Sequence, residues 1–377
     1  MMDLAQRQRF FSTNLLAWYD VHKRDLPWRR NKNPYYIWIS EIMLQQTRVD
    51  TVIPYWHRFI EKFPTIEALA DAPEDEVLKA WEGLGYYSRA RNLQSAVREV
   101  METYGGIVPD TKPEISGLKG VGPYTAGAIL SIAYNKPEPA VDGNVMRVLS
   151  RYFLIEEDIM KGSTRAYMES LIYQLIPEGR AGDFNQALME LGAMVCTPKS
   201  PHCLTCPVME QCAGRLEGME ESLPVKTKAK PPRPEHRLAA VIAGTGERAG
   251  QFLIRRRPDT GLLARMWELP HVAAPEPGMA FAEGGEAAGE ALRAGLAAEA
   301  GLDIQPLRWL MLAEHTFSHI HWNMGVYVCE LAPGPDAAAA GAGDSGPPPG
   351  CAWVDAASWR EYAFPNVFLR IVKEYLK

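Results

Sequence analysis

Hydrophobic positions follow two different periods along the chain. From residue 3 to residue 220, apolar residues recur at the three- and four-residue spacing of helices, with glycine and proline between the blocks, and no alternating strand pattern interrupts them. Beyond residue 236 the period shortens. The sequence there predicts one helix, at 289–301, and strands at 237–244, 251–257, 319–331 and 351–356. We therefore expect a two-domain protein, all-α and then α+β.

A segment rich in lysine and proline, 222–236, separates the two patterns. Proline lacks the N–H that continues a helix, so we interpret this segment as a linker between domains at 1–221 and 237–377. Two further stretches, 273–289 and 332–350, are rich in alanine, glycine and proline. We interpret both as mobile loops.

Composition narrows the class of protein. With 47% hydrophobic and 23% charged residues, the 377-residue chain is typical of a soluble protein of two or three domains. No apolar run approaches the roughly 18 residues that cross a membrane, and the first residues lack the apolar core of a signal peptide. We expect a cytoplasmic protein with no membrane contact.

Net charge gives little sign of nucleic-acid binding. The formal charge is −6, and cutting the chain at residue 230 leaves both parts slightly acidic, so any contact with DNA phosphates must be local. Each basic cluster could equally be a solvated surface. The clusters are Lys23, Arg24, Arg29, Arg30 and Lys32; Arg89 and Arg91; and Lys226, Lys228 and Lys230.

Four of the six cysteines are spaced C-x6-C-x2-C-x5-C, at Cys196, Cys203, Cys206 and Cys212. Disulfides are rare in a cytoplasmic protein, so this spacing indicates metal ligation. Four thiolates suit either zinc or an iron–sulfur cluster, and the spacing does not decide between them. The two remaining cysteines lie in apolar, strand-like surroundings and are expected to be small buried side chains.

Two carboxyl groups are candidates for catalysis. Glu41 is surrounded in sequence by apolar residues, and desolvation would raise its pKa toward neutrality, as a general acid requires. The alternative is that Glu41 points to solvent. Asp142 directly precedes an amphipathic helix, so it could be an N-cap, a catalytic group or both. A Gly-x-Gly turn, Gly120 to Gly122, precedes Pro123 at an expected helix start, where backbone amides can hold a phosphate. The alternative is a plain connection between two helices.

These motifs resemble, in order and spacing, the helix-hairpin-helix DNA glycosylases with an iron–sulfur cluster, and within them the MutY-type adenine DNA glycosylases. The resemblance rests on SEIMLQQT around Glu41, LKGVGPYTAGAI around the hairpin, VDGNVMRV around Asp142, and the four cysteines. It implies a 4Fe-4S cluster rather than zinc. It also implies removal of adenine mispaired with 8-oxoguanine or guanine in double-stranded DNA by a monomeric, nucleoid-associated enzyme.

The resemblance assigns roles to the two carboxyls and to Tyr124. Glu41 would protonate the adenine ring at position 7 and later handle the water, while ionised Asp142 stabilises the sugar cation by electrostatics or a transient covalent bond, with Asn144 positioning it. Related enzymes that also cleave the strand carry a lysine where this chain has Tyr124. We therefore expect a monofunctional glycosylase, in which the phenol orients Asp142 or the flipped nucleotide.

The same resemblance implies further DNA contacts. Base removal requires that the base leave the duplex, which calls for a pocket and a wedge. Ordinary core packing is the alternative for the two aromatic residues among them. The adenine pocket would be lined by Arg24, Leu26, Trp28, Arg29 and Gln186, and Gln46, Thr47 and Tyr86 would lie in the stack near the orphan base.

The second domain resembles the Nudix fold in the stretch GLLARMWELP and the helix after it. A hydrolase of oxidised nucleotides is therefore a rival function, but the positions of the Nudix carboxylates hold one carboxylate of three. Those positions are Ala294, Gly295, Ala298 and Glu299. We thus expect a Nudix-like domain that binds and does not hydrolyse.

The segment Phe317, Ser318 and His319 matches the loop by which this family recognises 8-oxoguanine, although it could be only a polar turn between strands. Two rival functions remain for the whole chain. One is an endonuclease III-like glycosylase acting on oxidised pyrimidines, which Tyr124 and the second domain disfavour. The other is a non-catalytic iron–sulfur protein that binds lesions, which would not need both Glu41 and Asp142.

Overall fold

The computed structural model describes residues 4–228, 230–332 and 346–377, and its contacts divide the chain into two compact units. The first unit comprises residues 1–72 and 89–229, and the second comprises 73–88 and 230–377. The segment 73–88 continues the helical pattern of the sequence but groups with the second unit. Helical periodicity reports local structure only, so it could not reveal this grouping.

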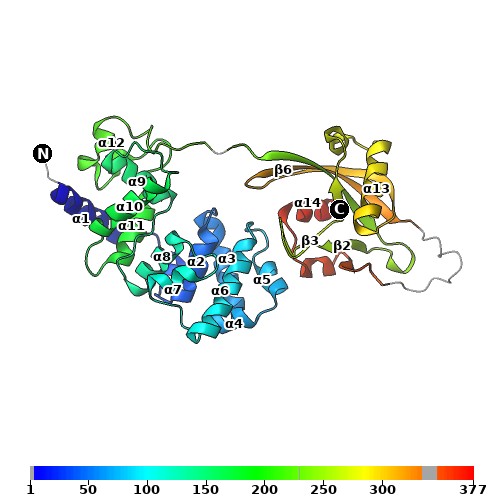
Figure 1. Ribbon diagram of the computed structural model, residues 1–377, viewed down its shortest axis with the longest axis horizontal. Coiled ribbons are helices and arrows are strands. Elements are labelled where there is room, and N and C mark those ends of the chain that lie inside the picture. The colour runs from blue at the N-terminus through cyan, green and yellow to red at the C-terminus, as the bar shows by residue number, and fades with distance from the viewer. Residues whose placement is uncertain (1–3, 229, 333–345) are drawn as a thin grey trace. The chain divides into compact units, whose positions relative to one another are not determined.

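In its described residues, the regular secondary structure of the first unit is all helical, as the sequence predicted (Figure 1). Its α-helices are α1 (Leu4–His22), α2 (Pro34–Leu44), α3 (Val49–Lys62), α4 (Ile66–Asp71), α6 (Ser88–Tyr104), α7 (Lys112–Gly117), α8 (Pro123–Tyr134), α9 (Gly143–Phe153), α10 (Gly162–Leu175), α11 (Ala181–Met194) and α12 (Ala213–Leu216). Short 3-10 turns lie at Pro27–Arg29, Cys203–Thr205 and Met209–Gln211. None of the described helices is long and apolar enough to span a membrane.

Helices α7 and α8 form the predicted hairpin. Pro123 is the first residue of α8 and Gly122 is its N-cap, while Gly120 has a φ of +80°, which favours glycine. Gly127 allows α8 to pack closely against the segment before α9, because a Cβ there would lie 1.8 Å from the carbonyl oxygen of Pro139. This contact fixes the position of the hairpin relative to the segment that precedes Asp142.

The second unit is built on a mixed sheet. Its described strands are β1 (Arg233–Ala243), β2 (Phe252–Arg256), β3 (Trp267–Glu268), β4 (His271–Ala273), β5 (Ile304–Thr316), β6 (Ile320–Leu331) and β7 (Cys351–Val354). The strand order is β3-β2-β1-β6-β5, with β4 paired to β1 and β7 to β2. Strands β1 and β6 pair in parallel and the others antiparallel. Helix α5 (Glu74–Ala80) and 3-10 turns at Gly246–Arg248, Pro277–Phe281 and Ser358–Glu361 belong to this unit as well.

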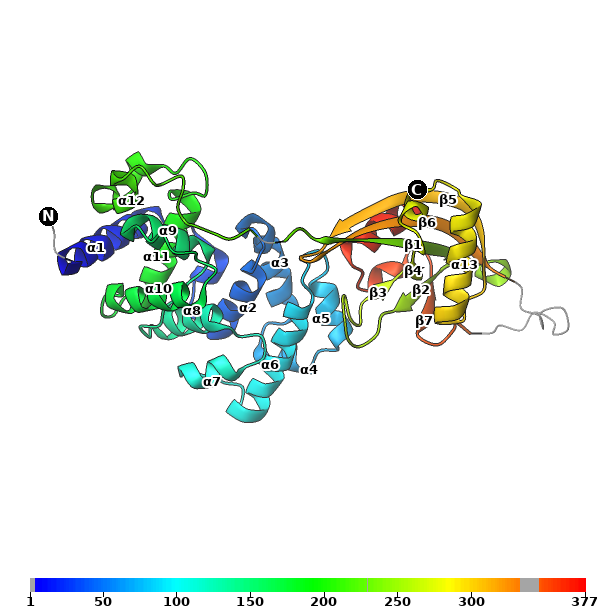
Figure 2. The same cartoon turned by 45° about the horizontal axis from the view of Figure 1, so that its top comes forward.

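Two helices cover opposite faces of the sheet, and Figure 2 shows α13 (Glu286–Ala300) along one of them. Alternate residues of β1 point to opposite faces. Leu238, Ala240 and Ile242 pack against α13, whereas Ala239 and Val241 join a cluster with α14 (Asn366–Tyr375). The unit is therefore the α+β domain that the sequence predicted.

Several elements differ from the sequence prediction. Strand β1 begins at Arg233, so the last four residues of the expected linker are strand, because they pair with β6 even though they include Pro234. The expected loop 273–289 contains a 3-10 turn and the start of α13. Most of the loop expected at 332–350 lies outside the described residues.

Strand β5 and helix α14 were missed. The pairing of β5 with β6 shifts register twice, between Pro306 and Arg308 and between Trp309 and Met311, and such bulges break the alternation that marks a strand in sequence. Helix α14 buries residues 367, 368, 371 and 372, which is ordinary helical spacing that the sequence already displayed.

Candidate active site

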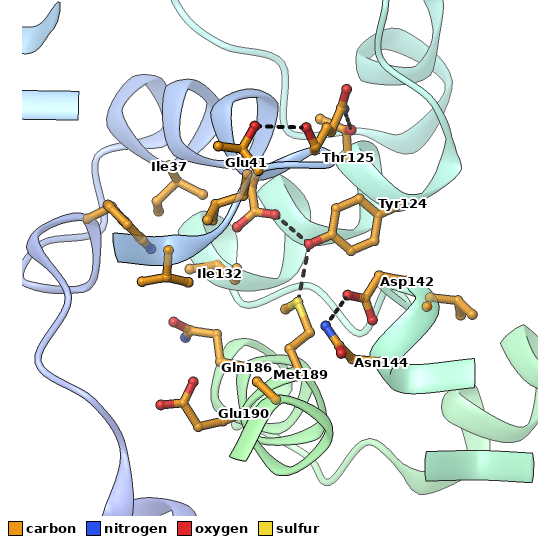
Figure 3. A pocket seen from close by; sticks show the side chains of 18 of the residues that line it. Ile37, Glu41, Tyr124, Thr125, Ile132, Asp142, Asn144, Gln186, Met189 and Glu190 are labelled. Carbon is orange, nitrogen blue, oxygen red and sulfur yellow. Dashed lines mark hydrogen bonds between the residues drawn. The ribbon is translucent and has the colours of Figure 1, made fainter. Parts of the chain in front are cut away.

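One cavity in the helical unit collects most of the side chains that the sequence singled out (Figure 3). It has a volume of about 790 Å3 and is lined by residues of α2, α8, the start of α9, α11 and the turn Pro27–Arg29. The sequence candidates that line it are Arg24, Leu26, Trp28, Arg29, Glu41, Gln46, Thr47, Gly120, Gly122, Tyr124, Asp142, Asn144 and Gln186.

Glu41 is buried on α2, so the alternative in which it points to solvent is wrong. Its side chain is only 4% exposed. Burial raises the pKa of Glu41 from its ordinary 4.5 to about 7; the hydrogen bond from Tyr124 and the charge of Arg29 oppose this rise, and the charge of Asp142 adds to it. A carboxyl group with this pKa can carry a proton at neutral pH and release it, as a general acid does.

Tyr124, in the first turn of α8, contacts Glu41 and not Asp142. Its hydroxyl oxygen lies 2.6 Å from Glu41 Oε2 and 3.2 Å from Met189 Sδ (Figure 3). Burial and the neighbouring carboxyls raise the pKa of Tyr124 well above its ordinary value, so the phenol keeps its proton. Tyr124 therefore does not orient Asp142 by a hydrogen bond in this structure, because its hydrogen bond goes to the other carboxyl. Its expected role toward the flipped nucleotide stays a prediction.

Asp142 is the N-cap of α9, as its place in the sequence predicted. One carboxylate oxygen accepts a hydrogen bond of 2.8 Å from the amide of Val145, and the other accepts one of 2.9 Å from Nδ2 of Asn144. Burial raises the pKa of Asp142, while these hydrogen bonds oppose the rise. Asn144 thus positions Asp142, and capping does not prevent Asp142 from facing the cavity (Figure 3).

A buried ion cluster forms another part of the cavity wall. Glu190 is 1% exposed and accepts hydrogen bonds of 2.8 to 2.9 Å from the guanidinium groups of Arg24 and Arg29. Burial would raise the pKa of Glu190, but these arginines outweigh it and hold the pKa at about 2. The sequence reasoning missed Glu190 and Met189, although they follow Gln186 at the i+3 and i+4 positions that share one helix face.

Arginines of α9 connect this site to the cysteine loop. Asn144 Oδ1 accepts a hydrogen bond from Arg147, which also donates to the carbonyl of Cys196 at 2.7 Å. Arg151, which is 2% exposed, donates to Cys196 Sγ at 3.3 Å. The first cysteine of the motif and the cap of Asp142 are therefore held by neighbouring turns of one helix.

The four motif cysteines carry free thiols in a loop with little regular structure. Cys196, Cys206 and Cys212 pack against the same hydrophobic core. Burial raises the pKa of Cys206 to about 12, and the charges of the other three thiols add to this rise, so the four groups lie near enough to interact. A bound cation would favour the thiolates. No closed set of three or more metal ligands is formed within the described residues, yet the number and grouping of the sulfurs fit a four-thiolate centre.

Some residues of the basic clusters have structural roles. Arg89 donates to the backbone carbonyls of Ile42, Met43 and Gln45, and thereby holds the end of α2. Arg30 pairs with Asp25 at 2.8 Å. The Arg89 contacts withdraw this arginine from the set that is available for DNA phosphates, whereas the exposed pair of Arg30 and Asp25 is weak and leaves Arg30 accessible.

The segment Phe317, Ser318 and His319 is the turn between β5 and β6 in the second unit. Its backbone is fixed on both sides: Phe317 N donates to the carbonyl of Ile320, and Arg233 N donates to the carbonyl of His319. Ser318 and His319 are exposed, while the Phe317 ring packs at 4.9 Å from that of Trp322. The turn thus exposes two polar side chains, while backbone hydrogen bonds and the packing of Phe317 fix its conformation.

Tyr86 lies in the second unit, in the segment 73–88. It is 47% exposed and has a φ of +48°. An aromatic ring of this exposure is not a core residue, so the core-packing alternative is wrong for Tyr86. Trp28 is 5% exposed and lines the cavity, so it serves both the core and the cavity wall.

Both units match known protein families. Residues 39–174 match the HhH-GPD superfamily of base excision DNA repair proteins, and residues 241–374 match the NUDIX domain. The adenine DNA glycosylase of Rattus norvegicus is 39% identical over 85% of this chain and 70% of its own length. The corresponding protein of Mus musculus is 38% identical over 93% of this chain and 74% of its own length. This chain belongs to the adenine DNA glycosylase family.

Membership confirms the expected class of protein: the chain is a DNA N-glycosylase of base excision repair, and DNA is its partner. Among solved structures, a thermostable thymine-DNA glycosylase is 32% identical and superposes with a TM-score of 0.51, covering 56% of this chain and 98% of that one. The helical fold is therefore shared with a glycosylase named for another base.

Proposed function

We propose that this glycosylase removes adenine mispaired with 8-oxoguanine or guanine, and that it leaves the DNA strand intact. The observation that carries the proposal is the set of groups around the cavity: a buried carboxyl with a raised pKa, a second carboxyl held by hydrogen-bond donors, and Tyr124 in place of an amine. A phenol cannot form an imine with the sugar. We further propose a monomeric, cytoplasmic enzyme.

Glu41 acts as the general acid. Adenine is a poor leaving group as an anion, so its departure requires protonation of the ring, and Glu41 donates that proton at ring position 7. Once adenine has left, the resulting carboxylate accepts a proton from the attacking water. The pKa of about 7 serves both directions of transfer.

Asp142 stabilises the positive charge that develops on the sugar. It is fixed as the cap of α9, so the carboxylate needs no rearrangement as the charge forms. The ion cluster of Glu190 with Arg24 and Arg29 holds one wall of the adenine pocket, beside Leu26, Trp28 and Gln186.

Cys196, Cys203, Cys206 and Cys212 would hold a 4Fe-4S cluster, the group that the resemblance favours over zinc. When bound, the cluster supplies a fixed centre for a loop that has little regular structure of its own. Arg151 would then donate its hydrogen bond to a ligated sulfur. The catalytic steps above need only the chain's own side chains.

The second unit recognises the base opposite adenine. Oxidation of guanine turns the acceptor at ring position 7 into a donor and adds an oxygen at position 8, so Ser318 and His319 can distinguish the two bases by hydrogen bonds. Tyr86 enters the stack near this base, with Gln46 and Thr47 contributing from the helical unit. We expect a Ser318→Ala, His319→Ala double variant to lose its preference for 8-oxoguanine over guanine; an unchanged preference would remove this role.

Nucleotide hydrolysis is not part of the proposal. Helix α13 has Ala294, Gly295 and Ala298 where Nudix hydrolases carry ligands, and a Cβ at Gly295 would lie 2.9 Å from the side chain of Val272. A larger side chain would therefore have to displace the side chain of Val272. Turnover of 8-oxo-dGTP in a phosphate-release assay would contradict this conclusion.

The decisive experiment uses a labelled duplex with a single adenine opposite 8-oxoguanine, incubated with the full-length protein. A gel is run with and without hot alkali. Cleavage only after alkali is the expected result, since alkali breaks the strand where a base is missing. Cleavage without alkali would reveal an amine nucleophile, and no cleavage would favour a protein that only binds lesions. A duplex with an oxidised pyrimidine tests the endonuclease III-like alternative.

A further inference from the structure

The hydroxyl of Tyr124 has two hydrogen-bond acceptors and one proton. Glu41 Oε2 lies 2.6 Å away on one side and Met189 Sδ lies 3.2 Å away on the other (Figure 3). A tyrosine hydroxyl donates one hydrogen bond and accepts others. Both neighbours can therefore be satisfied at once only if Glu41 donates to the tyrosine oxygen and the tyrosine donates to the sulfur.

The direction of these hydrogen bonds depends on the protonation state of Glu41. When Glu41 is ionised, it can only accept, so the Tyr124 proton points to the carboxylate. When Glu41 is protonated, it donates to the tyrosine oxygen, and the Tyr124 proton needs another acceptor. On the side away from the cavity the surroundings are apolar, since Tyr124 and Met189 pack against Ile37, Ala128, Ile132 and Ala140. A buried donor without an acceptor costs free energy.

We propose that Met189 is a positioning residue that stabilises the protonated, catalytically competent form of Glu41 by accepting the hydrogen bond of Tyr124. Met189 acts through Tyr124 and need not touch the substrate. Its place on α11 supports this role, because it shares with Gln186 and Glu190 the helix face that lines the cavity. The inference rests on the proposed role of Glu41 as the acid.

Charged groups near Glu41 also affect its protonation, independently of Met189. Asp142, at the start of α9, favours the protonated form, whereas Arg29, from the turn before α2, favours the ionised form. Glu190, on α11, is neutralised by its arginine partners. None of these groups is altered by a change at Met189, so a shift in the titration of Glu41 would report the sulfur contact.

The test is the variant Met189→Leu, which keeps the size of the side chain and removes the acceptor. Single-turnover adenine excision from an A:8-oxoguanine duplex is measured against pH. The midpoint of the alkaline loss of activity should move to lower pH by about half a unit. The shift is small because a sulfur atom is a weak hydrogen-bond acceptor. The rate on the alkaline side should fall by about threefold, with the acidic plateau unchanged. A general disturbance of the pocket would lower the rate at every pH.

A control and a double variant make the result decisive. Met168→Leu makes the same change at a fully buried core position on α10 and should leave the profile in place. In a Tyr124→Phe background, Met189→Leu should cause no further shift, because the donor is gone. Profiles of Met189→Leu and wild type that superimpose would overturn the inference. A wild-type rate without any alkaline limb would instead refute the acid role of Glu41.

Discussion

Replacement of Glu41 by glutamine should abolish excision and at the same time stabilise the protein at alkaline pH. The folded protein binds a proton on Glu41 up to about pH 7, whereas the unfolded chain releases it near 4.5. Folding stability therefore falls as pH rises through this window. At 1.36 kcal/mol for each pH unit, the rise of 2.5 units from 4.5 to 7 corresponds to about 3 kcal/mol. Glutamine does not ionise and avoids this cost.

The difference in the free energy of unfolding between the Glu41→Gln variant and the wild type should therefore increase with pH. We expect the variant to be more stable by about 1 kcal/mol at pH 5.5 and by about 3 kcal/mol at pH 8.5. Urea unfolding at both pH values measures this difference. Glu102→Gln, at an exposed position on α6, serves as the control, and its difference in stability from the wild type should not increase with pH. If the extra stability of Glu41→Gln stayed constant with pH, the conclusion that Glu41 is buried and binds a proton up to about pH 7 would be refuted.

Three further changes test other parts of the site. Asp142→Asn keeps an oxygen to cap Val145 but loses the acceptor for Asn144, so it should cost about 1 kcal/mol of stability. Loss of about 4 kcal/mol of charge stabilisation should slow single-turnover excision about a thousandfold. Near-normal excision would disprove the role of Asp142. Glu190→Ala leaves two arginines unpaired and should cost about 3 kcal/mol in urea unfolding, and a loss below about 1 kcal/mol would show that the ion cluster is solvated. Gly127→Ala should unfold the protein or lower its melting temperature sharply, whereas Gly117→Ala, with open space around it, should not.

The sequence predicted the parts of the fold that depend on local pattern. The helical unit, the hairpin with Pro123 at its helix start and the cap of α9 follow from spacing and capping chemistry, which act within a few residues. Strand β5 was missed because its bulges are set by the partner strand β6. The grouping of 73–88 with the second unit depends on contacts more than 150 residues away in sequence, such as the amide of Phe364 donating to Glu82.

The candidate site shows the same division. Burial of Glu41 could be predicted because apolar neighbours surround it in sequence, and the N-cap role of Asp142 because a helix follows it. The partner of Tyr124 could not be predicted, since α2, α8 and α9 meet only in the folded chain. Met189 was missed for another reason: a methionine on a helix face carries no chemical signal until its sulfur is seen beside a polar hydrogen.

The two carboxyls share one cavity, and burial raises the pKa of both, but their hydrogen-bond partners differ. Asp142 accepts hydrogen bonds from the amide of Val145 and the side chain of Asn144, and donors of this kind favour a charged carboxylate. Glu41 has the hydroxyl of Tyr124, which can reverse its direction because Met189 offers a second acceptor. The charge of Asp142 in turn favours the proton on Glu41. Any change that weakens the cap of α9 should therefore reduce the acidity difference between the two groups, even where it leaves both side chains in place.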